Sequence, residues 1–255
     1  MVLKLPSLLW YTVDGNMKPK VEYLRGFLGL SAETAGRLLV KTPQLFSYSI
    51  DGGIRPKVAY FVEELGFSQE EVGAIVARSP QILGYSVEEN VKPKVLFLQR
   101  ALRASTNQVR EMLLKYPNLL NLSVSNNIEP KVKFFQEVLG GSVEEVRAAV
   151  LATPNLLGYS MERRIVPRVL ALRGVGVAPL SFAEHHWHVT SYTDKRFRDW
   201  LRRKISEIHK DEPEQEQRAL MKRAVELMNL MATETTLTAA VGNNDAVVAA
   251  MAGRQ

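Results

Sequence analysis

The chain has 255 residues, of which 46% are hydrophobic and 24% are charged, an ordinary balance for a globular protein with a sizeable core. Its 33 Lys and Arg residues outnumber 27 Asp and Glu residues, and the resulting net charge of +6 weakly favours a polyanionic partner. The absence of cysteine excludes disulfides, thiolate metal sites and cysteine nucleophiles. No apolar run approaches the roughly 18 residues that span a bilayer, so we expect a soluble protein without a membrane partner.

Two series of prolines recur along the chain, each with a step of 37 residues. Internal repetition with a period between about 20 and 50 residues is the sequence signature of a stacked repeat protein. The sequence therefore predicts an all-α solenoid of repeats of about 37 residues. The first series is Pro6, Pro43, Pro80, Pro117 and Pro154, and the second is Pro19, Pro56, Pro93, Pro130 and Pro167.

Other columns repeat in the same register. An apolar pair follows each first proline, then in most units a tyrosine, then a hydroxyl residue, as in Leu45-Phe46, Tyr48 and Ser49. A base and a valine follow each second proline. Because proline at the first helical position sacrifices no hydrogen bond, we expect Pro-Lys-Val to open the first helix of each unit.

Capping signals define a second helix in each unit. Gly29 and Gly66 can adopt the left-handed conformation that ends the first helix, and the third unit has the variant Leu102-Arg103. Ser31, Ser68, Ser105 and Ser142 then stand at N-cap positions; Ser68-x-x-Glu71 and Ser142-x-x-Glu145 are capping boxes, and Ser105-x-x-Gln108 is the amide version. The second helix should stop before the next proline, leaving a short 3₁₀ turn as the third element.

The tyrosines of these columns allow two interpretations. They could form a ladder on which bases stack, or they could fill the core between neighbouring repeats. Side chains at a fixed repeat position more often contact the next repeat, so we favour the second interpretation.

The combined pattern resembles the mitochondrial transcription termination factor (mTERF) motif over about residues 6 to 205. The stretch from Pro80 to Ala152 carries it most fully, with Pro-x-Ile-Leu-x-Tyr-Ser followed by Lys92-Pro93-Lys94-Val95. Other helical repeats have different periods, such as about 34 residues for tetratricopeptide and 33 for ankyrin units. Because Pro6 opens a third element, we expect five partial or complete units with the first one incomplete.

The resemblance implies a superhelical stack of three-helix units that holds double-stranded DNA or structured RNA along a basic concave face. It implies a role in transcription termination or another step of mitochondrial or plastid gene expression, including ribosome assembly and intron splicing. The segment from Ser191 to Phe197 resembles the closing basic-aromatic helix of the family, and Arg196 matches an arginine that contacts nucleic acid in DNA-binding members. Residues 1–9 resemble neither a signal nor a transit peptide, so for an organellar protein we expect this chain to be a mature form or an engineered version of it.

Basic residues recur in register and could neutralise a regularly spaced phosphate backbone. The alternative interpretation is that they lie at solvated helix ends. One set flanks the second proline, and Arg163 and Arg164 lie in the loop ahead of the last of these prolines. Another set precedes the first proline, and a third lies within residues 195–204, where Phe197 and Trp200 are interleaved. We predict backbone contact and not base readout. The candidate residues are Lys18, Lys20, Lys41, Arg55, Lys57, Arg78, Lys92, Lys94, Lys115, Lys131, Arg163, Arg164, Arg168, Lys195 and Arg196.

The chain should divide into repeats over 1–180, a basic closing segment over 181–210, a helix over 211–231 and a disordered tail over 232–255. The 211–231 helix has apolar spacing that suits either a cap on the stack or a protein partner's site. His185, His186 and His188 could suggest a metal, but without cysteine we interpret them as a loop cluster.

The sequence carries no Walker, Rossmann, zinc-protease or nucleophile-elbow motif, so we expect a non-enzyme that needs no cofactor. The leading hypothesis is a monomeric nucleic-acid-binding solenoid. The alternative is a protein-binding helical-repeat scaffold, which an exposed apolar groove would favour and the basic columns disfavour.

Overall fold

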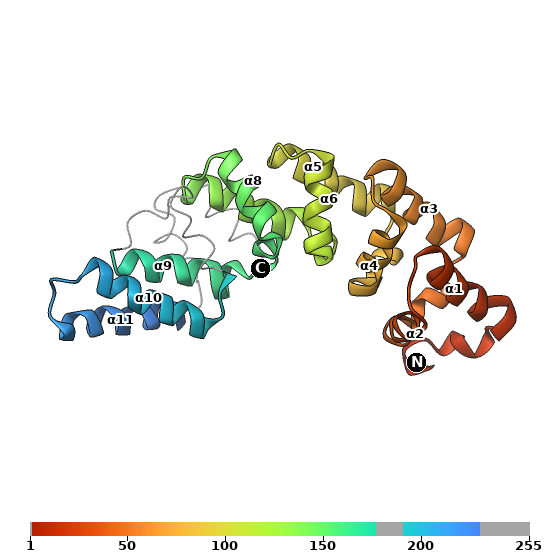
Figure 1. Cartoon of the computed structure of the whole chain (residues 1–255), viewed down its shortest axis with the longest axis horizontal. Coiled ribbons are helices and arrows are strands. Elements are labelled where there is room, and N and C mark those ends of the chain that lie inside the picture. The colour runs from red at the N-terminus through yellow and green to blue at the C-terminus, as the bar shows by residue number, and fades with distance from the viewer. Residues whose placement is uncertain (1, 177–190, 230–255) are drawn as a thin grey trace. The chain divides into compact units, whose positions relative to one another are not determined.

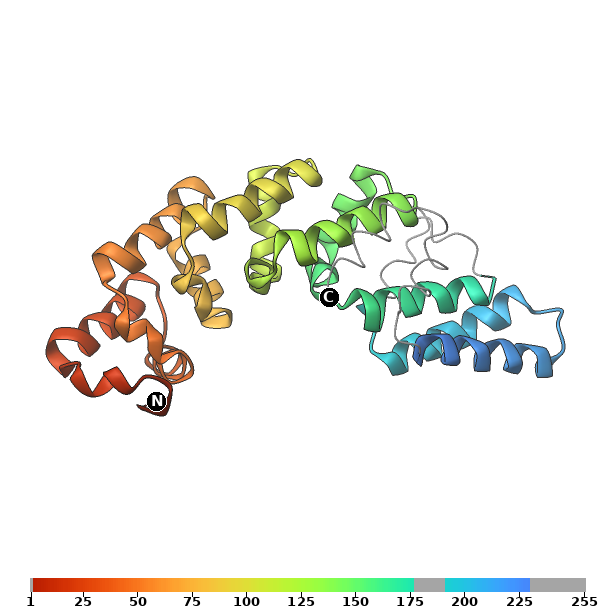
Figure 2. The same ribbon diagram turned by 180° about the vertical axis from the view of Figure 1, so that it is seen from behind.

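The computed structural model describes residues 2–176 and 191–229, and every regular element in these two ranges is a helix. The chain divides into two compact units, which we describe separately. The first comprises Met1–Arg100 with Ala104–Asn121, and the second comprises Ala101–Arg103 with Leu122–Gln255. Figures 1 and 2 show the helices of both units from opposite sides. The predicted all-helical repeat fold is confirmed.

The first helix of each repeat runs without a break from a hydroxyl N-cap. It ends two residues before a residue with positive φ. These helices cover residues 13–27, 50–64 and 87–101, and in the second unit 124–138 and 161–174. Each begins with a π-helical turn, and its central part is α-helical. The α-helical parts are α1 (Lys18–Glu22), α3 (Arg55–Ala59), α5 (Lys92–Ala101), α7 (Glu129–Lys133) and α9 (Val166–Gly174).

The second proline lies in the first turn of the α-helical part, as predicted, but the helix as a whole begins earlier than predicted. The N-cap is the hydroxyl residue seven positions earlier, and the Thr12 side chain accepts from the Gly15 backbone N–H at 3.2 Å. Lys18, just before Pro19, is already helical, with φ −57° and ψ −50°. Proline inside a helix removes one N–H and its ring crowds the preceding turn. The π-helical turn ahead of each proline is wider and gives that ring room.

The second helices follow the capping signals. They are α2 (Ala32–Lys41), α4 (Gln69–Arg78) and α6 (Thr106–Lys115) in the first unit and α8 (Val143–Ala152) in the second. All three predicted capping boxes are present, and each second helix ends two residues before a proline. The expected left-handed glycines are also present, with φ +65° at Gly29 and +71° at Gly66. Arg103 takes this role in the third repeat, with φ +47°.

The predicted 3₁₀ turn lies between the second helix of one pair and the first helix of the next pair. We count each structural repeat from the proline of this turn, so that the first and second helices follow it. These turns cover Pro6–Trp10, Pro43–Ser47, Pro80–Gly84 and Pro117–Asn121, and Pro154–Gly158 in the second unit; a further one covers Val2–Lys4. From the second repeat on, the proline and both apolar residues of each turn are buried. Together with the buried apolar faces of the helices, they form the core within each unit.

Neighbouring second helices in the first unit approach closely, with α2 lying against α4 and α4 against α6. Gly73 permits a different close approach, between α4 and the end of the first helix of the preceding repeat, because a Cβ placed there would lie 2.1 Å from the Leu28 carbonyl oxygen. Gly36 occupies the same position one repeat earlier, and a Cβ there would meet nothing within 4 Å.

We predict that Gly73→Ala destabilises the protein by about 1–3 kcal/mol, because the backbone at Leu28 must shift to admit the methyl group. Gly36→Ala is the matched control and should instead stabilise it by up to about 1 kcal/mol through better helix propensity. Urea unfolding of both variants measures the difference. Equal effects of the two substitutions would contradict a close approach at Gly73.

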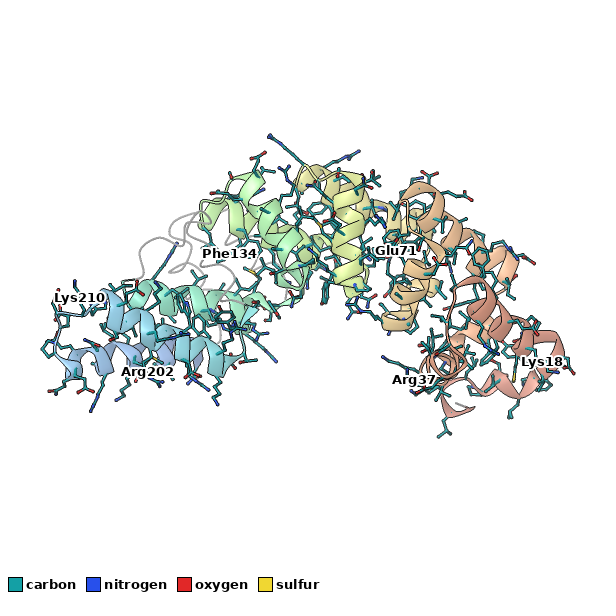
Figure 3. The ribbon with its side chains drawn as sticks, in the orientation of Figure 1. Lys18, Arg37, Glu71, Phe134, Arg202 and Lys210 are labelled. Carbon is teal, nitrogen blue, oxygen red and sulfur yellow. The ribbon has the colours of Figure 1, made fainter. Side chains whose placement is uncertain are left out.

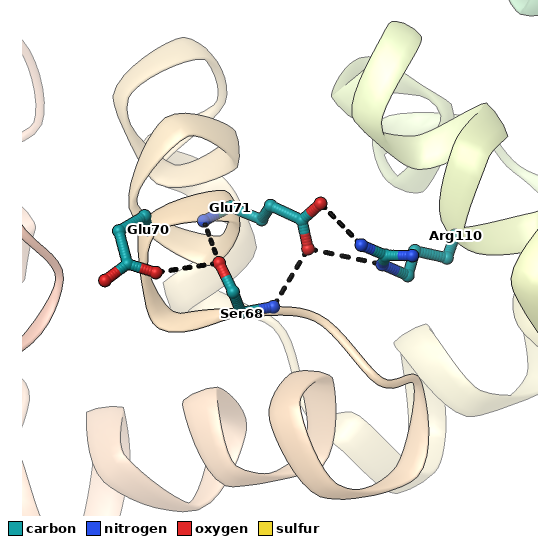
Figure 4. A network of polar contacts seen from close by, with 4 residues as sticks. All are labelled: Ser68, Glu70, Glu71 and Arg110. Atoms are coloured by element: carbon teal, nitrogen blue, oxygen red, sulfur yellow. Dashed lines mark hydrogen bonds and ion pairs between the residues drawn. The ribbon is translucent and has the colours of Figure 1, made fainter.

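One polar network links the second and third repeats (Figure 4). The Ser68 hydroxyl and the Glu71 carboxylate form the capping box of α4, and the same carboxylate binds the Arg110 guanidinium of α6, at 2.5 Å for the shorter contact. The hydrogen bond from Arg110 and that from the Ser68 backbone hold the pKa of Glu71 below its ordinary value of 4.5. Glu71 therefore caps its own helix and ties it to the next one.

A carboxyl group whose pKa is lowered on folding contributes stability above its unfolded pKa, and that stability is lost as pH falls through the folded pKa. We therefore expect Glu71→Gln to unfold at lower urea concentration than the wild type at about pH 7, and the gap to narrow as pH falls below the ordinary carboxyl pKa of 4.5 and through the lowered pKa of the folded state. Urea midpoints measured across this range test the linkage. A gap that does not change with pH would show that the charge of Glu71 contributes nothing.

In the second unit, three helices close the described chain. They are α9, α10 (Asp194–Ile208) and α11 (Glu214–Asn229), and α11 lies beside both α9 and α10 (Figures 1 and 2). Leu227 approaches α9 so closely that a Cβ at Gly174 would lie 2.8 Å from its Cδ1. This contact packs α11 against α9. The three histidines at 185, 186 and 188 and the tail over 232–255 lie outside the described residues.

Candidate nucleic-acid interface

The base after each second proline is directed into the protein and not toward solvent. Lys20, Lys94 and Lys131 are buried, with exposed fractions of 6%, 8% and 1%, and Lys57 is half-buried. Each ammonium group donates to a backbone carbonyl 26 residues later, in the 3₁₀ turn of the next repeat. The acceptors are Phe46 O at 2.8 Å, Leu83 O at 2.5 Å, Leu120 O at 2.6 Å and Leu157 O at 2.6 Å. We call this contact the lysine latch.

Other groups complete the latch. In three repeats the ammonium also donates to an asparagine one helical turn earlier, namely Asn16, Asn90 and Asn127. In two repeats it lies over the tyrosine of its own unit, 5.1 Å from the Tyr48 ring centroid for Lys57 and 5.4 Å from Tyr85 for Lys94. Burial lowers the pKa of Lys20, Lys57 and Lys94. Hydrogen bonds from a cation to a carbonyl offset part of this desolvation.

Arg168 makes the equivalent contact at the end of the repeats. Its guanidinium donates to Tyr192 O at 2.8 Å and to the Asp194 carboxylate at 2.6 Å, and it lies 4.8 Å from the centroid of Phe197. Only 1% of the residue is exposed. Burial lowers the pKa of Arg168, which the hydrogen bond to Asp194 opposes. It fixes the start of α10 against α9.

These positions correct part of the predicted interface. Buried cations that already donate to carbonyls cannot reach a phosphate without opening a contact between repeats. The residues that we remove from the candidate interface on this ground are Lys20, Lys57, Lys94, Lys131 and Arg168.

The bases just before the second prolines are exposed, and each is paired with an acid four residues earlier. The pairs are Lys18 with Asp14, Arg55 with Asp51 and Lys92 with Glu88. The fourth repeat reverses the order, with Glu129 bound to Lys133 at 2.9 Å. Exposed pairs of this kind contribute little stability, and each contributes almost no net charge to the surface. Figure 3 shows Lys18 at the outside of the ribbon.

The bases at the ends of the second helices are also exposed, namely Lys41, Arg78 and Lys115. Arg78 donates to the Leu114 and Lys115 carbonyls, at 2.6 and 2.7 Å, and so holds the C-terminal end of α6. A guanidinium has five N–H donors, so Arg78 retains donors for another partner.

The tyrosine columns contact the next repeat, as the interpretation that we favoured requires. Tyr48 and Tyr85 are half-buried. A Cβ at Gly84 would lie 2.7 Å from the Tyr48 hydroxyl oxygen, and the Tyr85 hydroxyl donates to Asn121 at 3.1 Å. These two rings therefore belong to the junctions between repeats and do not form an open ladder for bases.

Helix α10 carries the densest exposed group of bases. Thr193 caps its N-terminus, and Phe197, Leu201 and Ile205 are buried at a spacing of four residues. The other side of the helix is consequently exposed to solvent, and Arg202 is labelled there in Figure 3. We call its five exposed bases the α10 basic face: Lys195, Arg196, Arg198, Arg202 and Arg203.

Two arginine–tyrosine stacks lie beside this face. Arg196 stacks on Tyr192 with its guanidinium carbon 4.1 Å from the ring centroid, and Arg164 stacks on Tyr159 at 4.2 Å. Arg164 also donates to Tyr192 O at 2.8 Å, which joins the two stacks. Stacking restricts the movement of each guanidinium and leaves edge N–H groups for bidentate contacts. Arg163 is exposed on the same turn that carries Arg164.

The distribution of charge separates the repeats from α10. Residues 1–176 contain 22 Lys and Arg against 16 Asp and Glu, but five of those bases are in the latch positions. Helix α10 carries six bases against three acids within its 15 residues. Arg202 pairs with Asp199 at 3.5 Å, and α10 as a whole keeps a net charge of +3 over its 15 residues.

Comparison with known proteins identifies the repeat. The sequence model of the mTERF family matches residues 1–152 and, in a second alignment, residues 105–198. The chain belongs to the mTERF family. The second mTERF match extends into α10, so the α10 basic face adjoins and partly overlaps the region that carries the family pattern. No curated protein matches the chain significantly.

No helix in the described parts of this mTERF protein is long and apolar enough to cross a membrane. In the same residues, no group of three or more His, Cys, Asp or Glu side chains is placed to hold a metal ion.

We predict that Lys131→Met, which keeps most of the aliphatic stem, destabilises the protein by about 1–3 kcal/mol because Leu157 O loses its charged donor. Lys133→Met, two residues away on the exposed side, should change stability by less than about 0.5 kcal/mol. Chemical unfolding provides both values. If Lys131→Met left the free energy of unfolding unchanged, the latch would not stabilise the junction.

Proposed function

We propose that this mTERF protein binds double-stranded nucleic acid through the α10 basic face and acts in organelle gene expression, in transcription termination or its regulation. The observation that carries the proposal is the concentration of five exposed bases on one side of α10. One of them, Arg196, is stacked on Tyr192, and Arg164 beside them is stacked on Tyr159. Arginine in such a setting suits bidentate contact with phosphate.

Backbone contact supports recognition of shape and charge and does not by itself read sequence. The exposed α10 bases are directed to the solvent side of one helix and bring no asparagine or glutamine for base edges. We therefore propose DNA or structured RNA as the ligand class, with the RNA roles in ribosome assembly or intron splicing as the alternative. A 2′-hydroxyl contact would separate the two.

The experiment is binding of fluorescent duplex DNA, duplex RNA and single-stranded RNA across a salt series. For contact with roughly 5–8 phosphates, the logarithm of the duplex affinity should fall against the logarithm of salt with a slope of about −4 to −7. Arg196→Gln with Arg203→Gln should flatten this slope by up to about 2 units. The matched control is Arg218→Gln with Lys222→Gln on α11, which removes the same charge from exposed residues of the same unit.

Equal loss in both double variants would show that only net charge matters and would contradict a specific role of α10. Absence of binding stronger than about millimolar at about 50 mM salt, for every nucleic acid, would overturn the proposed function. A protein partner on the repeats or on α11 would then become the leading candidate.

A further inference from the structure

A groove in the first unit, between α2 and α4, has a basic lining. Its volume is about 440 Å³. Four of its residues are on α2, two are at the end of α4 and one begins the following 3₁₀ turn. They are Thr34, Arg37, Leu38, Lys41, Ala77, Arg78 and Pro80.

The lining holds three cations and no carboxylate. The other second helices carry different residues at the positions of Thr34 and Arg37. Thr34 occupies the third helical position, where α4 and α8 have the capping-box acids Glu71 and Glu145. Arg37 occupies the position of Ala74, Glu111 and Ala148 in the other repeats. Relative to α4, helix α2 has therefore lost one acid and gained one base at this groove.

The three cations differ in how they are held. Arg78 is fixed by its hydrogen bonds to the Leu114 and Lys115 carbonyls, at 2.6 and 2.7 Å, and keeps spare N–H donors. Arg37 pairs with Glu33 at 3.3 Å, but both side chains are at least 70% exposed, so the pair can open readily. Figure 3 shows Arg37 at the outside of α2. Lys41 is exposed at the last position of α2.

The helix ends do not cancel this charge. A helix C-terminus carries the equivalent of about −0.5 charge, so the ends of α2 and α4 together offset only about one of the three positive charges. The groove therefore keeps a positive field. Its hydroxyl, guanidinium and ammonium donors are the groups that bind phosphate oxygens in proteins.

We infer that this groove binds one phosphate of the nucleic-acid backbone, and we call it the phosphate seat. Arg37 and Lys41 turn toward the phosphate, whereas Arg78 is already held in place by its own hydrogen bonds. The inference rests on the proposed function, because the phosphate is one of the duplex that we propose α10 binds. It adds a contact in the first unit to that of α10 in the second.

A variant in which α2 carries residues of α4 tests the phosphate seat without weakening the fold. Thr34→Glu with Arg37→Ala gives α2 the residues that α4 has at these positions and restores a capping box with Ser31. We expect thermal stability to be unchanged or higher, and duplex affinity at about 100 mM salt to fall roughly three- to tenfold with the salt slope flattened by about 1 unit. The matched control, Lys18→Gln with Arg55→Gln, removes the same net charge from exposed, acid-paired bases of the same unit.

A second measurement uses the wild-type protein and inorganic pyrophosphate, followed by amide resonances in ¹H–¹⁵N spectra. Shifts at residues 34–41 and 77–78 that vanish in the Thr34→Glu, Arg37→Ala variant are expected. Equal duplex binding by this variant and the Lys18→Gln, Arg55→Gln control, or no shifts at the groove, would overturn the seat. If the α10 double variant still loses affinity in that case, the proposed function stands and only the seat fails.

Discussion

The lysine latch is the contact on which the stack of repeats depends. One ammonium group in each first helix bonds to the backbone of the following repeat, 26 residues later. Removing a lysine from water is unfavourable, and the lowered pKa values of Lys20, Lys57 and Lys94 reflect this. The carbonyl it contacts is near the end of a short 3₁₀ turn, where backbone acceptors lack partners within the turn. The latch therefore satisfies two groups that would each be costly to bury alone.

The same contact explains why a basic protein has so little free charge along its repeats. Bases that recur in register looked like a line of phosphate contacts, but one column is used inside the stack and another is paired with acids on its own helix. Among the other exposed bases, five are on one side of α10, and three line the groove between α2 and α4 in the first unit. The chain thus separates bases that build the repeats from bases that can meet a ligand.

The sequence predicted the features that depend on local chemistry. The 37-residue period, the serine caps, the capping boxes at Ser68, Ser105 and Ser142, and the left-handed glycines all act within a few residues. The start of the first helix was missed because proline at the first turn is the commoner arrangement. The hydroxyl at Thr12 and Ser49 was the available signal, and Ser86-x-x-Glu89 even has capping-box spacing.

The burial of the lysines could not be read from the sequence. Their acceptor is a backbone carbonyl 26 residues away. Every residue has a carbonyl, so no residue type in the sequence marks the acceptor. The α10 basic face was identifiable from its composition, whereas the groove at Arg37 depends on two helices that only the fold brings together. Arg37 was consequently missing from the predicted interface.

The acceptor of the latch also affects how such an array can change. Because the lysine recognises the peptide backbone, the residue that supplies the carbonyl can be Phe46 in one repeat and Leu83, Leu120 or Leu157 in others without loss of the bond. A junction of this kind does not require a particular side chain in the repeat that supplies the carbonyl. Duplication, deletion or shuffling of whole 37-residue modules would therefore leave every junction chemically complete, and side chains exposed elsewhere would be free to diverge toward a ligand.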